Sequence, residues 1–433
     1  MRERPAGTSL ACGRDVEDTA LDLRSVVESR TPVSLDDSYS PSRPNSLNFI
    51  RWVLAAAVIF YHGYIIAAMS RNPLSRNLNV SPGPTAVLGF FLLSGFLISR
   101  SVKTSSSFGN YLWRRIIRIF PGYWVCLMVT AFVIGPLSWL HANGTLHGYR
   151  AVKPWLYVWD NKFLKLNRPA IHGVFTQTRM YAVTHSIPTN GSLWTLRYEF
   201  ICYVVVGVLG VVGLLWTRRV FMLGLTTLVG LVLLMQAVVT AVGPASPQLS
   251  KVLGPALLDP FSDPNMLRFV FAFFVGACFA LYAERIIIDD RLGLASFAAF
   301  LLIARWHGPT EVLGALPMLY AMLWLGQRML IPVWDRIGDP SYGVYVYGWP
   351  VQALLAEYGL HRALGIQLYI VISILVSTII GLLSWHLIEK QALKMKRFDP
   401  GRSVRSLVRR LTAPKPPEAA NTSPLGYGDS PSP

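Results

Sequence analysis

Three ionisable side chains occur within long apolar stretches of the chain, where such groups are costly. Arg51 and His62 belong to residues 46–69, a stretch long enough to cross a bilayer as a helix. They are eleven positions apart in the sequence, so in a helix their side chains point to within about 20° of the same direction and lie about 16 Å apart along the axis. Glu199 lies about five residues inside a later apolar stretch. Because ionisable residues in membrane spans usually mark a pathway or a reaction, and a His–Glu pair can deprotonate a hydroxyl, we treat the three as candidate catalytic residues.

Each of these side chains also has a structural explanation. Arg51 could extend to the lipid headgroups, and His62 could hydrogen-bond to a neighbouring helix. A carboxylate at the centre of a membrane helix costs roughly 2.5–3.5 kcal/mol on insertion scales, so Glu199 should have a partner. His62 and Arg197 are the two candidates for that partner, and a pair with Arg197 would be purely structural.

The composition is that of a membrane protein. Of the 433 residues, 52% are apolar and 15% are charged. The apolar residues occur in blocks of about 20 and do not alternate with polar ones, which predicts helices rather than a β-barrel. The net charge of +17 is concentrated in short loops and tails, where lysine and arginine determine membrane orientation. We therefore expect a lipid bilayer as partner and no nucleic acid.

The apolar pattern predicts an all-α polytopic protein with about ten transmembrane helices. Basic residues between 100 and 118 and after Lys390 place both termini in the cytoplasm. The organisation that we expect is a disordered cytoplasmic tail (1–45), a transmembrane domain (46–395) and a basic, Pro-rich disordered tail (396–433). A long extracytoplasmic loop would cover residues 141–191. The predicted spans are 46–69, 85–98, 119–140, 193–216, 220–242, 267–281, 292–303, 313–325, 341–355 and 366–388, of which the seventh and eighth are short for a full crossing.

This topology sorts the polar residues by depth. Arg51 would lie at the cytoplasmic side beside Arg115 and Arg118, and such a cluster can bind the phosphates of a cytoplasmic ligand. The alternative is an ordinary basic loop that only sets orientation. The four cysteines and the scattered histidines lack metal-binding or redox spacing, so we expect no metal.

Seven segments, in order, resemble the acyltransferase-3 family of bacterial integral-membrane O-acyltransferases, which modify cell-surface and secreted glycans and sometimes antibiotics. The resemblance covers roughly residues 44–395. It rests on Arg51 with His62 after ten intervening residues, FFLLSGFLIS (90–99), RRIIRIFPGYW (114–124), NGSLWTLRYEF (190–200), RFVFAFFVGA (268–277), SYGVYVYGWPVQ (341–352) and SWHLIEK (384–390).

The resemblance implies transfer of an acyl group, most commonly acetyl, from cytoplasmic acyl-CoA to a sugar hydroxyl at the outer face of the bacterial cytoplasmic membrane. The acceptor would be a glycan such as exopolysaccharide or lipopolysaccharide, or a glycosylated small molecule, and acyl-CoA would be a substrate rather than a bound cofactor. Arg51 would contact the thioester or the pantetheine arm, and His62 would act as general base or transient acyl carrier. Glu199 would orient His62 or the acceptor. Arg115 and Arg118 would contact the CoA phosphates, and Trp194 and Tyr198 are the candidate acceptor contacts.

The sequence departs from the family pattern at two positions. Many members have a histidine where this chain has Gly348, so we expect no second essential histidine at that position, and the usual proline after the last motif is Gln391. A transporter or flippase for a lipid-linked or small anionic solute is the alternative function, with Arg51 and His62 as a relay. Transporters often contain internal repeats, and the chain shows no convincing repeat.

Overall fold

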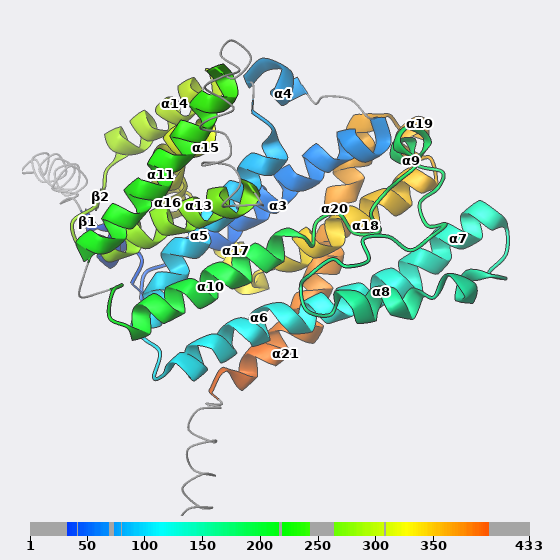
Figure 1. Cartoon of the computed structure of the whole chain (residues 1–433), viewed down its shortest axis with the longest axis horizontal. Coiled ribbons are helices and arrows are strands. Elements are labelled where there is room, and N and C mark those ends of the chain that lie inside the picture. Colours follow the sequence, from blue (N-terminus) through cyan, green and yellow to red (C-terminus); the bar gives the residue numbers. More distant parts are fainter. Residues whose placement is uncertain are drawn as a thin grey trace, which may run out of the picture.

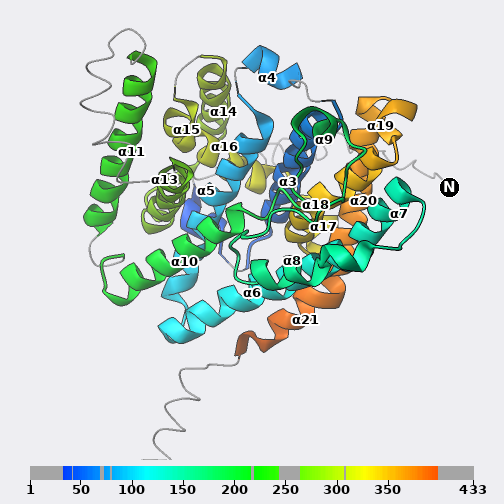
Figure 2. The same ribbon diagram turned by 45° about the vertical axis from the view of Figure 1, so that its right-hand side comes forward.

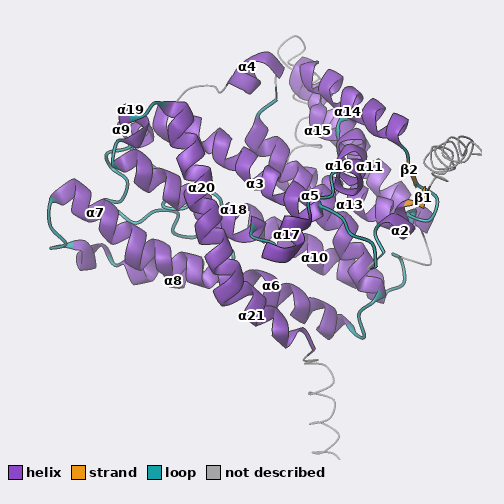
Figure 3. Cartoon of the chain, turned by 180° about the vertical axis from the view of Figure 1, so that it is seen from behind, coloured by secondary structure: helices purple, strands orange, loops and turns teal. Residues whose placement is uncertain are grey.

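Almost the whole described chain is helical. The computed structural model describes residues 33–40, 42–68, 73–78, 80–215, 219–242, 264–306 and 309–397. Seen from behind, the helices form one assembly with a single pair of very short strands at one end (Figure 3). Every predicted apolar block is helical: α3 (Leu47–Gly63) with the π-helical turn η1 (Tyr64–Ala68), α5 (Pro82–Lys103), α6 (Phe108–Val129) with η2 (Thr130–Ile134) and α7 (Gly135–Asn143), α10 (Thr195–Val211), α11 (Arg219–Val242), α13 (Pro264–Leu281), α14 (Asp290–Arg305), α16 (Ala315–Arg328), α18 (Ser341–Glu357) and α20 (Ile366–Ser384).

Several of these helices can cross a bilayer by length and composition. Within the described residues there are 5 such candidates, which agrees with a multi-pass membrane protein. The predicted seventh and eighth spans, α14 and α16, have 16 and 14 residues, so they measure only about 24 and 21 Å. Ten crossings and cytoplasmic termini therefore remain predictions. The candidate spans are Leu47–Ala67, Pro82–Lys103, Phe108–Asn143, Arg219–Thr240 and Ile366–Lys396.

The segment directly before the third predicted span, interpreted as a basic loop, is helical from Phe108 onward. The helical segment Phe108–Asn143 is continuous over 36 residues, and the arginines at 114, 115 and 118 lie on its first turns. Ser107 caps the start of this helix, because its hydroxyl accepts a hydrogen bond from the backbone N–H of Asn110. The charged residues lower the hydropathy of these turns, but the apolar residues between them continue one helical face.

The end of the predicted N-terminal tail is ordered. In β1 (Val33–Ser34) the backbone pairs antiparallel with β2 (Ile287–Ile288), and Leu35 in α2 (Leu35–Ser38) is completely buried. Tyr39 donates a hydrogen bond to the carbonyl of Leu323. The prediction of disorder is therefore wrong from residue 33 onward, because apolar side chains there pack against the helices. Residues 1–32 and 398–433 of the two predicted tails lie outside the described residues.

The remaining described elements connect the long helices. Between α7 and α10 the chain forms a folded cover rather than an extended loop, with Tyr149 and Tyr157 buried. Figure 1 shows α7 and α8 together at one end of the assembly. The connecting elements are α4 (Pro73–Leu78), η3 (Tyr149–Val152), α8 (Pro154–Asn161), α9 (Arg179–Thr184), α15 (Thr310–Leu313), α17 (Pro332–Ile337) and α19 (Leu360–Ala363). Beyond α20, the helical chain continues as η4 (Trp385–Glu389), α21 (Lys390–Leu393) and η5 (Lys394–Arg397).

Helix α18 forms the centre of the fold. It packs against α3 and α20, and the three helices lie side by side in Figure 2. Fifteen of its 17 residues are buried, including the polar Ser341, Gln352 and Glu357. Gln352 donates to the carbonyl of Ile59 in α3, and Tyr369 in α20 donates to the carbonyl of Gln352. Hydrogen bonds therefore fix α18 relative to both neighbours.

Helices α5 and α13 approach each other through two glycines. A Cβ atom at Gly95 would lie 2.0 Å from the carbonyl oxygen of Phe273, and one at Gly276 would lie 2.1 Å from that of Leu92. Close backbone contact of this kind is how small residues stabilise helix pairs in lipid. Gly95, the glycine of the segment FFLLSGFLIS, therefore allows α5 and α13 to pack closely.

Gly95→Ala should lower the stability of the protein. The added methyl group meets backbone that cannot yield easily, and overpacking of this kind typically costs about 1–3 kcal/mol. The unfolding midpoint in detergent measures the effect. Gly224→Ala in α11 is the matched control, because a Cβ there has nothing within 4 Å and alanine favours the helix. Equal midpoints for the two variants would contradict the packing argument.

Candidate active site

Two of the predicted arginines meet at one carboxylate. Arg51 in α3 and Arg118 in α6 both form an ion pair with Oδ2 of Asp339, and the Arg118 distance is 2.5 Å. Arg118 also lies 3.4 Å from the carboxylate of Glu389. All four side chains are largely or fully buried. The structure therefore brings Arg51 and Arg118 together as predicted, and balances their two positive charges with two carboxylates.

The two carboxylates are held by their own helices. Asp339 is separated from Ser341, the first residue of α18, by Pro340, and it accepts hydrogen bonds from the backbone N–H (3.2 Å) and the hydroxyl (2.5 Å) of Ser341. Glu389 ends the π-helical turn η4 and accepts a hydrogen bond from Ser384 at 3.1 Å. The ring of Trp385, in the same turn, lies 5.4 Å from the Arg118 guanidinium. Such turns often occur at functional sites.

Sequence reasoning missed both carboxylates. Glu389 lies inside the quoted motif SWHLIEK, and Asp339 stands directly before the ninth predicted span as Gly-Asp-Pro. The signal available in the sequence was a carboxylate at the end of each of these two spans, which buried arginines would need as a counter-charge. It could not identify partners, because Asp339 is 288 residues from Arg51 in the sequence.

Glu199 has different partners from those expected. Its carboxylate accepts a hydrogen bond from Ser94 at 3.0 Å and a short one from Tyr203. These two bonds replace the expected contact with His62 or Arg197. The position of Glu199 in its apolar stretch could not identify these partners, because they depend on how the helices are placed against each other. The role of Glu199 in the reaction stays a prediction.

A small cavity beside Arg51 and Arg118, which we call the inner cavity, also contains Glu199. Its volume is about 40 Å³. Arg51, Arg118 and Glu199 line it, with Tyr203 and residues at the start of α18. Arg115 does not line it: its guanidinium donates to Ser101 at 3.2 Å and lies 5.8 and 5.9 Å from the rings of Tyr111 and Tyr203. Arg115 therefore packs between aromatic rings, and its predicted contact with CoA phosphate remains untested.

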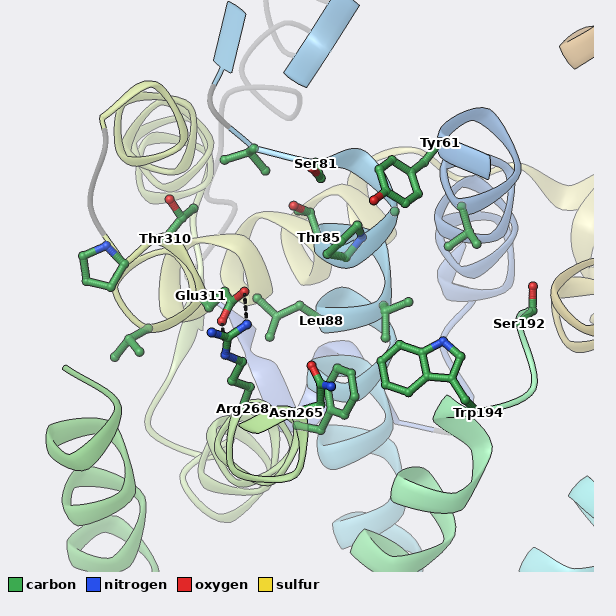
Figure 4. A pocket seen from close by; sticks show the side chains of 18 of the residues that line it. Tyr61, Ser81, Thr85, Leu88, Ser192, Trp194, Asn265, Arg268, Thr310 and Glu311 are labelled. Atoms are coloured by element: carbon green, nitrogen blue, oxygen red, sulfur yellow. Dashed lines mark hydrogen bonds and ion pairs between the residues drawn. The ribbon is translucent and has the colours of Figure 1, made fainter. Parts of the chain in front are cut away.

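A larger outer cavity contains His62. Its volume is about 620 Å³, which is in the range of small-molecule binding sites. Trp194 lines this cavity beside Ser192, and Arg268 and Glu311 form a two-point ion pair at 2.9 and 3.2 Å on the other side (Figure 4). The cavity therefore offers one aromatic face and several hydrogen-bonding groups.

His62 occupies the last turn of α3, directly before the π-helical turn η1. The indole of Trp349 packs edge-on against the imidazole at 4.8 Å. Trp349 itself donates to the carbonyl of Pro188, and its ring covers Gly191, where a Cβ would lie 2.7 Å away. The Nδ1 atom of His62 is buried and makes no hydrogen bond within the described residues. An imidazole held by an aromatic ring, with a ring nitrogen unpaired, can accept a proton.

The two predicted acceptor contacts differ in position. Trp194 lines the outer cavity, whereas Tyr198 lies one helical turn further on and packs against the rings of Trp194 (5.8 Å) and Phe269 (5.5 Å). Tyr198 therefore supports the cavity wall rather than lining it. Gly348, one of the two positions at which the sequence departs from the expected family pattern, faces Ile59, and a Cβ there would lie 2.8 Å from that side chain. No cluster of three or more metal-binding side chains occurs within the described ranges.

The comparison with known proteins identifies the family. A family described as an acyltransferase domain matches residues 45–386, which is most of the chain. This chain belongs to the acyltransferase-3 family. It is an acyltransferase, and the Arg51–His62 pair lies at the start of the matched region.

Two curated relatives match over nearly their whole length. An O-acetyl transferase of Shigella phage Sf6 is 28% identical over 366 residues, covering 81% of this chain and 96% of the relative. Nodulation protein 10 of Rhizobium leguminosarum bv. viciae is 25% identical over 381 residues, covering 83% and 96%. No solved structure matches the chain significantly.

Asp339→Asn should destabilise the protein strongly. It removes the charge shared by two buried arginines, and breaking a buried ion pair typically costs about 3–5 kcal/mol. Glu311→Gln is the matched comparison, because Arg268 and Glu311 are 46% and 43% exposed and an exposed pair contributes about 0–1 kcal/mol. Unfolding midpoints in one detergent compare the two. A larger loss for Glu311→Gln would show that the buried cluster is not important for stability.

Proposed function

We propose that the protein transfers an acyl group, most simply acetyl, from cytoplasmic acyl-CoA to a hydroxyl of a carbohydrate on the other side of the membrane. The observation that carries this proposal is that one helix, α3, presents Arg51 to an inner cavity lined by two arginines and His62 to a separate outer cavity. The name of the phage relative, an O-acetyl transferase, supports acetyl as the group and oxygen as the acceptor atom.

The inner cavity suits the donor. Guanidinium groups bind phosphate through two parallel hydrogen bonds, and CoA carries several phosphates. In the absence of donor, Asp339 and Glu389 balance the charges of Arg51 and Arg118. Donor phosphates would compete with these carboxylates for the arginines. Arg115 would then add positive potential near the same mouth, from its place one turn before Arg118.

The outer cavity suits a sugar. Its volume of about 620 Å³ accommodates one or two sugar rings, and an indole such as Trp194 presents a flat apolar face on which a sugar ring can stack. Ser192, Asn265 and the Arg268–Glu311 pair offer donors and acceptors for hydroxyl groups. The acceptor would therefore be a glycan such as exopolysaccharide or lipopolysaccharide, or a glycosylated small molecule.

The proposed reaction is the attack of the acceptor hydroxyl on the thioester carbonyl. His62 takes the hydroxyl proton as the C–O bond forms, the C–S bond breaks, and the proton passes to the departing CoA thiolate, so that an ester and free CoA result. Acyl transfer by way of the imidazole of His62 has the same overall balance. Arg51 and His62 are about 16 Å apart along α3, so the pantetheine arm must span the distance between phosphates and reaction centre.

The remaining proposals concern the membrane. We place the protein in the bacterial cytoplasmic membrane, with about ten crossings and both termini in the cytoplasm. The basic residues before and within the first turns of α6 and after Lys390 support this orientation. A reporter fused after Leu407 should be active only on the cytoplasmic side, and activity only on the outer side would reverse the topology.

His62→Ala should abolish acylation while leaving acyl-CoA binding within about twofold of the parent, because His62 lines the outer cavity whereas Arg51 and Arg118 line the inner one. Arg118→Ala should weaken acyl-CoA binding by roughly 10–150-fold, the loss of a charged contact. The measurements are acyl-CoA affinity of the purified protein and the mass of cell glycans with and without each variant. If His62→Ala weakens donor binding as much as Arg118→Ala, the division between an inner donor site and an outer acceptor site is wrong.

The same measurements test the transporter alternative. A carrier of a lipid-linked or anionic solute would neither bind acyl-CoA nor change the mass of any glycan or secreted metabolite. Unchanged masses on removal of the protein, with no protection of the purified protein by acyl-CoA, would favour the carrier and reject the proposed reaction.

A further inference from the structure

The inner and outer cavities share one wall. Of the residues that line them, Tyr345 in α18 and Val87 in α5 are common to both. At the start of α10, consecutive residues line different cavities: Trp194 lines the outer cavity, whereas Thr195 and Leu196 line the inner one. The boundary between the two cavities therefore passes through the start of α10 and the middle of α18.

The Tyr345 side chain is held in place by specific contacts. Its hydroxyl and that of Thr195 are joined by a hydrogen bond of 2.6 Å, and the Phe90 ring packs edge-on against its ring at 5.7 Å. The side chain is buried. This is a bulky side chain with a single hydrogen bond at its tip, and it can be displaced by rotation without breaking the backbone of either helix.

The inner cavity is too small for the proposed donor in this conformation. A volume of about 40 Å³ holds on the order of one water molecule, which occupies about 30 Å³ in the liquid. An acyl group carried on a pantetheine arm needs far more room and must reach His62 on the other side of the shared wall. The wall must therefore open, and Val87 has a much smaller side chain to move than Tyr345.

We propose that Tyr345, held closed by Thr195, is the barrier between the donor and acceptor cavities and selects the acyl group by size. The proposal rests on the proposed function, because it assumes that an acyl group crosses from one cavity to the other. Tyr345 acts as a specificity-determining residue: a short acyl chain passes the displaced ring, and a longer one does not.

The barrier can be tested without any turnover. Leu196→Cys places a thiol in the inner cavity, and Trp194→Cys places one in the outer cavity. A membrane-impermeant thiol reagent is added to vesicles from the side that labels Trp194→Cys, and labelling at position 196 is followed by peptide mass spectrometry. The buried native cysteines Cys126, Cys202 and Cys278 are resolved as separate peptides.

With Tyr345 present, position 196 should be labelled far more slowly than position 194. Tyr345→Phe keeps the ring but removes the hydrogen bond, which should accelerate labelling about two- to tenfold. Tyr345→Ala removes the ring and should accelerate it at least as much. Tyr347, buried two residues further along α18 and lining neither cavity, provides the control, because Tyr347→Phe and Tyr347→Ala should leave the rate unchanged.

Three results would overturn the barrier: fast labelling of position 196 in the parent, an unchanged rate in both Tyr345 variants, or equal acceleration by Tyr347→Ala. None of these measurements needs an acyl donor or an acceptor. If the proposed function is wrong, no acylated product is found, but the labelling pattern is unchanged. Failure of the proposed function can therefore be distinguished from failure of the proposed barrier.

Size selection has its own readout. Acylated products are compared by mass after supply of acetyl-CoA or butyryl-CoA to vesicles that carry the native acceptor. Tyr345→Ala should raise the ratio of butyrylated to acetylated product, and Tyr347→Ala should not. A ratio that is equal in the two variants would show that Tyr345 does not select the acyl group.

Discussion

The arrangement of the site depends on one shared carboxylate. Asp339 accepts from Arg51 and Arg118 at the same oxygen, while its other oxygen accepts from Ser341, the first residue of α18. One side chain thereby joins α3, α6 and the central helix. Two guanidinium groups alone would repel each other in a low-dielectric interior, so the carboxylate is what allows both to face the same cavity. The distance between the inner and outer cavities then follows from the rise of α3.

The charge cluster and the imidazole illustrate two ways of making a polar group tolerable among apolar helices. The arginines are paired with carboxylates, and Arg118 also lies over the ring of Trp385. His62 is instead packed against Trp349, which the cover over the outer side holds through Pro188. The first arrangement gives a fixed charge, and the second leaves an imidazole nitrogen available. A reaction that needs anion binding at one end and proton transfer at the other requires both.

The sequence predicts which segments are helical, but not which side chains of different helices contact each other. Every apolar block is helical, because twenty consecutive apolar residues in a membrane have no other way to satisfy their backbone. The meeting of Arg51 with Arg118 was predictable, since both occupy the basic end of their spans. The pairing of Glu199 with Ser94 and Tyr203, and the position of Asp339 between the arginines, depend on helix placement that no periodicity contains. Order at residues 33–40 was missed for the same reason: its partner strand is more than 250 residues away.

The sequence separation of Arg51 from its counter-ion also has a consequence during biosynthesis. Arg51 is added to the nascent chain 288 residues before Asp339, and translation at about 5–20 residues per second makes this an interval of roughly 15–60 s. Throughout that time α3 must reside in the translocation channel or the bilayer with its guanidinium satisfied by water or lipid phosphate. Until α18 is synthesised, α3 therefore lacks the carboxylate that pairs with its guanidinium in the finished fold.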